Sequence, residues 1–236
     1  MTTTSATHVR ATIVGSLPDR RIAAQFSADN LDGKRACKAQ LQQLFGLPEN
    51  PFVPVIASIG RMATQKGLDI VVHNHALFHF AAQYVFMGSG DKRLEDAVQA
   101  LHAAMPNRVG VVTKFSDELE HVMIAGADLY LMPSQYEPCG LTQMRAQRYG
   151  TIPVARRVGG LADTIDDGLT GFLFDAFDER ALVGGIWRAM TEHRSAKAWR
   201  EMQTAAMGQD FGWDRVAERY SEIYTRAIGI AARRVG

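Results

Sequence analysis

The chain is short of cysteine, of excess charge and of long apolar runs, and each shortage excludes a class of protein. Its 236 residues contain only 2 cysteines, Cys37 and Cys139, too few for a disulfide framework or a cysteine zinc cage. The net charge of +1 argues against a nucleic-acid binder that works by overall charge. A hydrophobic content of 47% excludes global disorder. Since no run of about 18 apolar residues occurs, no membrane-spanning helix is expected.

The length and composition of the chain fit one large α/β domain, and its low cysteine count fits a reducing compartment. The first residues, MTTTSATHVRATIVGSLP, lack the apolar core of a secretory signal, and their Ser, Thr and Arg content resembles an organelle transit peptide. Residues 1–28 are therefore expected to be a poorly ordered leader or approach segment. The expected location is the cytoplasm, with a plastid as the alternative if this start belongs to a transit peptide.

Apolar runs of strand length alternate with helical patterns between residue 29 and about residue 175. The runs stand at 53–60, 83–88, 108–115, 128–133 and 152–155. This alternation is typical of βαβ units and predicts an α/β fold with a doubly wound parallel sheet. From about residue 178 only helical segments follow, around 180–190, 196–207 and 213–228. We therefore expect a single Rossmann-like domain over 29–236 that ends in a helical cap.

Two cations follow the first predicted strand. Arg61 and Lys66 lie in the loop GRMATQKG, which is bounded by glycines and leads into a predicted helix over 67–80. Ligands of an open parallel sheet bind at the carboxyl ends of its strands, and backbone N–H groups at a helix start favour an anion. A planar guanidinium and a compact ammonium suit phosphate oxygens. The alternative is a pair of solvated surface cations.

A carboxylate follows the fourth predicted strand, in PSQYEPCGLT. Pro138 restricts Glu137 to extended backbone, which would aim the carboxylate along the sheet edge toward a polyhydroxyl ligand. The alternative is an acid that merely stabilises the following helix start. Cys139 is a candidate nucleophile by its place before that helix, but no neighbouring residue supplies a base, so a structural thiol is the better interpretation.

Three further features are less specific. The loops GSGD at 88–91 and RRVGGLADT at 156–164 follow two other strands and suit either tight turns or phosphate contacts. His73, His75 and His79 are expected on one helix, where His75 and His79 could face one metal. No Glu completes an HExxH arrangement, so a polar helix face is favoured.

The motifs described above, in the order in which they occur along the chain, resemble those in the C-terminal half of bacterial glycogen synthase and plant starch synthase. The resemblance runs from about Asp19 to Ala227, and its most specific parts are YEPCGLTQ and RYGTIPV followed by GGLADT. Family membership implies the GT-B architecture, in which two Rossmann-like domains face each other across a cleft. It implies retaining transfer of glucose from ADP-glucose, sometimes UDP-glucose, to the non-reducing end of an α-1,4-glucan, with no metal or other cofactor.

The resemblance also implies roles for individual residues. Arg61 and Lys66 would hold the nucleotide diphosphate, and Glu137 would contact the donor glucose and support positive charge at its anomeric carbon. These three are the candidate catalytic residues. Phe115 would stack on the adenine. The donor glucose and distal phosphate would be lined by Cys139, Gly140, Leu141 and Thr142. The implied partners are ADP-glucose or ADP, an α-1,4-glucan and a separate N-terminal GT-B domain, with no nucleic acid and no membrane.

Two departures from the family weaken the expectation of full activity. The half that carries the Lys-x-Gly-Gly-Leu motif is absent, and Arg145 stands where many related transferases have a second Glu. A weakly active donor-binding half is therefore expected. The alternatives are a non-catalytic nucleotide-sugar-binding or partner subunit and a different retaining GT-B transferase, such as a sucrose or trehalose enzyme.

Overall fold

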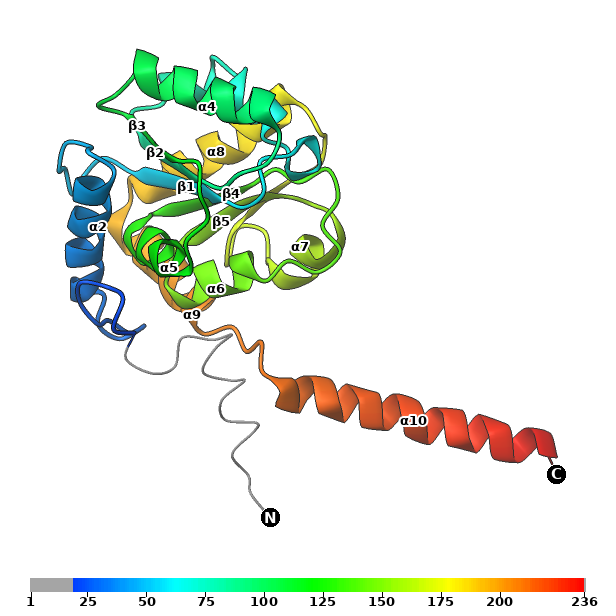
Figure 1. The fold of residues 1–236 in the computed structure, drawn as a ribbon. Helices are drawn as coiled ribbons and strands as arrows, with labels where there is room; N and C mark the ends of the chain where they lie inside the picture. The colour runs from blue at the N-terminus through cyan, green and yellow to red at the C-terminus, as the bar shows by residue number, and fades with distance from the viewer. Residues whose placement is uncertain (1–18, 236) are drawn as a thin grey trace. The chain divides into compact units, whose positions relative to one another are not determined.

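The computed structural model describes residues 19–235, which fall into two compact units (Figure 1). The larger unit spans residues 19–209, and residues 210–235 belong to the other, which contains helix α10 (Trp213–Val235). Of the expected leader over 1–28, residues 1–18 lie outside the described residues. Within residues 19–28, Asp19 and Ile22 are buried, and the Asp19 carboxylate is paired with His121 at 2.8 Å.

Six short strands alternate with helices in the larger unit. The strands are β1 (Val55–Ile59), β2 (Gln83–Met87), β3 (Val109–Val112), β4 (Leu129–Met132), β5 (Ile152–Arg156) and β6 (Phe172–Phe174). The helices are α2 (Asp32–Leu44), α3 (Asp69–Val72), α4 (Lys92–Ala104), α5 (Asp117–Gly126), α6 (Thr142–Arg148), α7 (Gly159–Thr164), α8 (Glu179–His193) and α9 (Ala196–Met207). Two 3-10 turns, η1 (Thr64–Lys66) and η2 (Leu77–His79), lie on either side of α3.

The strands form one parallel sheet in the order β3-β2-β1-β4-β5-β6. The chain moves outward from β1 to β3, then returns to place β4 on the other side of β1. This reversal makes β1 and β4 the topological switch point, and open α/β sheets bind ligands outside the carboxyl ends of the strands at such a point. The predicted doubly wound parallel sheet is confirmed.

Both faces of the sheet are buried, which explains the continuous apolar runs in the sequence. In β2, Tyr84 and Phe86 face one hydrophobic cluster, and Val85 and Met87 face the other. The first cluster includes residues of α3, α4, α8 and α9, and the second includes residues of α2, α5, α6 and α7. Figure 1 shows α4 and α8 over one face and α2, α5 and α6 over the other.

The structure differs from the sequence prediction in two elements. Strand β6 was not predicted, because three residues are too few to show a period. The continuous helix expected over 67–80 is wrong, since only α3 and the two 3-10 turns form there. Asn74 explains the break: its Oδ1 accepts from the N–H of Leu77 at 3.1 Å, and its Nδ2 donates to Glu179 O at 3.1 Å. The side chain thus replaces helical backbone bonds.

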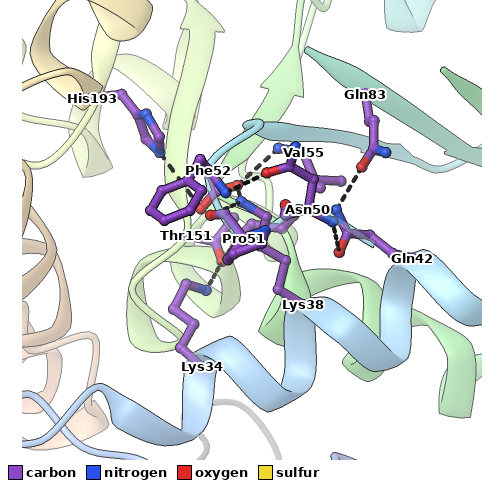
Figure 2. A network of polar contacts seen from close by, with 12 residues as sticks. Lys34, Lys38, Gln42, Asn50, Pro51, Phe52, Val55, Gln83, Thr151 and His193 are labelled. Atoms are coloured by element: carbon purple, nitrogen blue, oxygen red, sulfur yellow. Dashed lines mark hydrogen bonds and ion pairs between the residues drawn. The ribbon is translucent and has the colours of Figure 1, made fainter. Parts of the chain in front are cut away.

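A buried polar network fixes the amino ends of the strands, on the edge opposite the predicted site (Figure 2). Asp128, just before β4, accepts at Oδ2 from the N–H of Val55 and from Lys38 Nζ, each at 2.8 Å. Lys38 also donates to Pro51 O at 3.1 Å. Although burial opposes ionisation, Lys38 and His193 hold the pKa of Asp128 below its usual value.

None of the helices in residues 19–235 combines the length and apolarity that a bilayer span needs.

Candidate functional site

The loop after β1 lies directly against the loop after β4. Gly67 ends η1 with a φ of +72°, and a Cβ there would lie 1.9 Å from Pro133 O, so only glycine permits this approach. The N–H of Gln135 donates to Gln65 O at 2.8 Å and fastens the two loops. This packing brings Lys66, the last residue of η1, to the segment that carries Glu137.

Lys66 and Glu137 form an ion pair. The Nζ of Lys66 lies 2.5 Å from Oε2 of Glu137, and Ser134 Oγ donates to the same oxygen at 3.4 Å. The Glu137 side chain is only 9% exposed, whereas that of Lys66 is 32% exposed. The carboxylate is therefore held in one place, while the ammonium keeps access to solvent and to a ligand.

Arg61 lies on the same rim as this ion pair. Its Nη2 donates to Gln65 Oε1 at 3.0 Å, and the side chain is exposed. A cavity of about 250 Å³ at the carboxyl ends of β1, β2 and β4 brings these groups together. Its lining includes Arg61, Lys66, Ser134, Glu137, Gly140, Leu141 and Thr142. Two cations from the loop after β1 and a carboxylate from the loop after β4, which is 71 positions from Lys66, thus share one pocket.

The loop from Glu137 to Thr142 forms one wall of the cavity. Gly140 has a φ of +70°, a conformation that side chains disfavour, and Leu141 follows in the right-handed helical region. The buried Tyr130 hydroxyl donates to Ile59 O at 3.0 Å and is also hydrogen-bonded to Thr142. Burial raises the pKa of Tyr130, so this hydroxyl stays protonated and links the end of β1 to the start of α6.

Two predicted site residues do not line this cavity. Phe115 lies in the loop after β3 and is 52% exposed. Cys139 is exposed, and its Sγ lies 3.7 Å from Gly140 O, without a base beside it among its described contacts. Arg145, at the position where the resemblance led us to expect a second Glu, does not line the cavity either, and its Nη1 pairs with Glu120 Oε1 at 2.7 Å.

The remaining strand-end loops have structural partners. Arg156 donates to Gln135 O at 2.8 Å, and Arg157 pairs with Asp175 at 2.9 Å and with Asp167 at 3.1 Å. The N–H of Met62 donates to Ser89 O at 2.9 Å, so the loop after β2 is bonded to the loop after β1. These contacts show that both loops pack around the site.

The histidines do not share a helix. His73 caps α3, His79 lies in η2, and His75 lies between them. The i,i+4 geometry that would let His75 and His79 face one metal is therefore not formed. Within residues 19–235, no group of three or more His, Cys, Asp or Glu side chains is arranged to hold a metal ion.

Sequence reasoning missed Ser134 and Gln65. Ser134 contacts Glu137 from three residues before it, a spacing that could have drawn attention to it. Gln65 contacts Arg61 and also donates from Nε2 to Tyr136 O at 3.3 Å. No sequence signal separates Gln65 from an ordinary polar loop residue, because its partner lies 71 residues away.

Comparison with known proteins places this site in a family. Residues 42–205, more than half of the chain, match the family described as "Glycosyl transferases group 1". The chain belongs to the group 1 glycosyl transferases. The matched range contains both loops that form the cavity, so the site described above lies inside the family's shared region.

Within the group 1 glycosyl transferases, the similarity to glycogen and starch synthases is confirmed. The chain is 47% identical over 214 residues to the glycogen synthase of Anaeromyxobacter sp. strain Fw109-5, which covers 87% of this chain and 45% of that protein. The catalytic domain of starch synthase IV from Arabidopsis thaliana, bound to ADP and acarbose, superposes with a TM-score of 0.80 and 32% identity. That match covers 89% of this chain and 46% of the starch synthase chain.

A sucrose-phosphate synthase from Thermosynechococcus elongatus is less similar. Its TM-score is 0.61, its identity is 25%, and the match covers 81% of this chain and 49% of that chain. This group 1 glycosyl transferase therefore spans about half the length of the curated relatives that it matches.

Proposed function

We propose that this chain is the donor-binding half of a retaining glucosyltransferase that uses ADP-glucose to extend an α-1,4-glucan. One observation carries the proposal: Lys66 and Glu137 form an ion pair at 2.5 Å in a cavity that Arg61 also lines. Cations suit a diphosphate, and a fixed carboxylate suits the sugar attached to it. The similarity to glycogen synthase and starch synthase supports this choice of donor and acceptor.

The charges of the pocket match those that develop during glucosyl transfer. The bond from the anomeric carbon to the diphosphate oxygen breaks, a bond to the acceptor 4-hydroxyl forms, and the hydroxyl proton leaves with the diphosphate. Negative charge grows on the leaving group and positive charge on the sugar. Arg61 and Lys66 would meet the first and Glu137 the second, and preorganised charges of this kind lower the barrier.

The other residues suggested by the resemblance have specific proposed positions. The backbone N–H groups of Gly140, Leu141 and Thr142 would receive the distal phosphate or the glucose, since all three residues line the cavity. Phe115 would stack on the adenine from the loop after β3, where its side chain is half-exposed. Cys139 would contribute backbone only. We propose no metal, because the two cations would neutralise the diphosphate.

The proposed partner is a second GT-B domain that supplies the opposite wall of the cleft. This chain spans 45% of the related glycogen synthase, so the remainder of such a protein would carry the acceptor surface. Closure of a cleft between two walls excludes water from the transferring sugar. On this proposal the chain alone transfers glucose weakly, and the cytoplasm remains the proposed location.

A glucose-incorporation assay tests the proposal. Radiolabelled ADP-glucose and glycogen are supplied to the full chain, with and without a separately expressed N-terminal half of a related glycogen synthase. We expect little incorporation by the chain alone and a clear increase when the second half is added. Incorporation that stays at background in both mixtures, although the chain binds ADP-glucose, would instead favour the non-catalytic partner subunit.

A different retaining transferase is the second alternative. The sucrose-phosphate synthase match has lower identity and a lower TM-score than the starch synthase match, which favours the glucan as acceptor. Adding fructose 6-phosphate in place of glycogen discriminates the two, because only a sucrose-type enzyme would consume it.

A further inference from the structure

Gln143, in the first turn of α6, fastens the loop that forms one wall of the cavity. The side chain is fully buried, and its Nε2 donates to Gly140 O at 2.9 Å and to Cys139 O at 3.2 Å. The same nitrogen lies 3.0 Å from Thr164 Oγ1, which accepts because its own proton is donated to Gly160 O at 2.5 Å; the two hydrogens of the amide are thus shared among three acceptors. One amide group thus ties two successive loop carbonyls to α7.

These contacts fix the direction of two N–H groups. The peptide bonds are trans, and in a trans peptide the carbonyl of one residue and the N–H of the next point in opposite directions. Since the carbonyls of Cys139 and Gly140 point at Gln143, the N–H groups of Gly140 and Leu141 point away from it. Gly140 and Leu141 line the cavity, whereas Gln143 is not among its lining residues.

The backbone of this loop also has the form of an anion-binding concavity. Gly140 has a positive φ of +70°, and Leu141 follows with φ −109° and ψ −30°. Alternation of left-handed and right-handed conformations turns successive N–H groups toward one point, where they bind an anion. A Cβ at Gly140 would lie 2.4 Å from Gln143 Oε1, so the glutamine amide packs directly against the glycine.

We propose that Gln143 is a positioning residue that holds the N–H groups of Gly140 and Leu141 toward the distal phosphate of the nucleotide donor. The inference rests on the proposed function, because it names a residue that serves the same pocket without touching the ligand. Its orientation is set by its three acceptors, which leaves Oε1 buried without a hydrogen-bond partner among the described residues.

Gln147 supplies a matched control on the same helix. It is also fully buried, its Nε2 donates to Thr164 O at 2.8 Å, and its Oε1 likewise lacks a partner among the described residues. It differs from Gln143 in one respect that matters here: its Nε2 donates to Thr164 O and not to a carbonyl of the loop over 137–141. Replacing each glutamine by methionine keeps the volume and removes the amide in both cases.

The experiment is a calorimetric titration of the full chain with ADP and with AMP, for the wild type, Gln143→Met and Gln147→Met. We expect Gln143→Met to weaken ADP binding by about tenfold, the scale of a hydrogen bond to a charged group, and to leave AMP binding unchanged. Gln147→Met should leave the preference for ADP over AMP intact. Thermal unfolding should shift by similar amounts in the two variants.

Two binding results would overturn the inference, and they are distinguishable. A wild-type chain that binds ADP no more tightly than AMP removes the proposed phosphate site and the inference with it. A wild-type preference for ADP that survives in Gln143→Met overturns the role of Gln143 alone. Amide hydrogen exchange of the wild type tests the inference without a variant: ADP should protect the amides of Gly140 and Leu141 more than AMP does, and equal protection contradicts it.

Discussion

The ammonium of Lys66 lies 2.5 Å from the carboxylate of Glu137, although the two residues are 71 positions apart in the chain. The pair exists because the loop after β1 and the loop after β4 meet at the switch point of the sheet. A diphosphate that binds Lys66 must share this ammonium with Glu137 or displace the carboxylate. The two groups are therefore energetically coupled.

This coupling predicts that Glu137→Gln tightens ADP binding. Removing the carboxylate charge frees Lys66 for the phosphate, and a partly exposed ion pair of about 1 kcal/mol corresponds to an affinity gain of about fivefold. The variant should not gain affinity for ADP-glucose, because the sugar of that ligand loses its contact with the carboxylate. Isothermal titration with both ligands measures the difference. Weaker binding of ADP by the variant would show that Glu137 does not compete for Lys66.

Two glycine substitutions in helices should change the stability of the chain in opposite directions. A Cβ at Gly160, in α7, would lie 1.9 Å from Cys139 O, so Gly160→Ala should displace the loop of Glu137 and destabilise the chain by about 1–3 kcal/mol. At Gly184, in α8, a Cβ would meet no heavy atom within 4 Å. Gly184→Ala should therefore stabilise the chain by about 0.5–1 kcal/mol. Urea unfolding measures both, and equal effects would mean that α7 does not support the loop.

The sequence predicted where the strands end, but it did not predict the contacts between the loops that follow them. The apolar runs before Arg61 and Glu137 mark buried parallel strands, and the rule that parallel strands place their carboxyl ends at one edge brings these residues together. The contacts of Gln143 with Thr164, and of Gly67 with Pro133, join segments far apart in the chain and leave no periodic signal. The helix expected at 67–80 failed because the side chain of Asn74 bonds locally.

The Asp19 carboxylate, at the start of the described chain, should make the stability of the fold depend on pH in the acidic range. The Asp19 carboxylate accepts from Tyr149 at 2.6 Å and from Arg21 at 2.7 Å. Burial would raise its pKa, but the hydrogen bonds from Arg21 and Tyr149 outweigh that effect and lower the pKa from its usual 3.8 to about 2. Because the folded pKa is the lower one, Asp19 stabilises the fold above pH 3.8, and this contribution is lost as the pH falls toward 2.

We therefore expect Asp19→Asn to be less stable than the wild type by about 2 kcal/mol at pH 7, with the two converging near pH 2. Denaturant unfolding at a series of pH values measures the gap. A gap that stays constant down to pH 2 would show that the charge of Asp19 does not stabilise the fold.

Lys34 should make the stability of the fold depend on pH in the alkaline range. Its buried ammonium donates to Ala125 O, Tyr149 O and Thr151 Oγ1, all neutral acceptors, at 2.9, 3.0 and 2.7 Å; Figure 2 shows the contact with Thr151. The two carbonyls lie at the carboxyl ends of α5 and α6, which favour a cation. Burial nevertheless lowers the pKa of Lys34 from 10.5 to about 8, against the opposing charge of Asp128.

Between these two values the folded chain releases the proton while the unfolded chain keeps it, so stability rises with pH. We expect the wild type to gain about 2 kcal/mol relative to Lys34→Met between pH 8 and pH 10. Burial raises the pKa of Cys37, which lowers stability above its usual value of 9, and both proteins keep this buried thiol. Parallel stability curves for the two proteins would contradict the prediction.

The most direct test of the account is the affinity of Lys66→Ala for ADP and AMP, measured by calorimetry. Lys92→Ala is the matched control, because Lys92 is an exposed lysine that pairs with Asp96 on α4, away from the cavity lining. If Lys66 holds the distal phosphate, its loss weakens ADP binding by about tenfold or more and leaves AMP binding nearly unchanged, whereas Lys92→Ala changes neither. Equal losses for ADP and AMP in Lys66→Ala would contradict the assignment of this pocket to a nucleoside diphosphate.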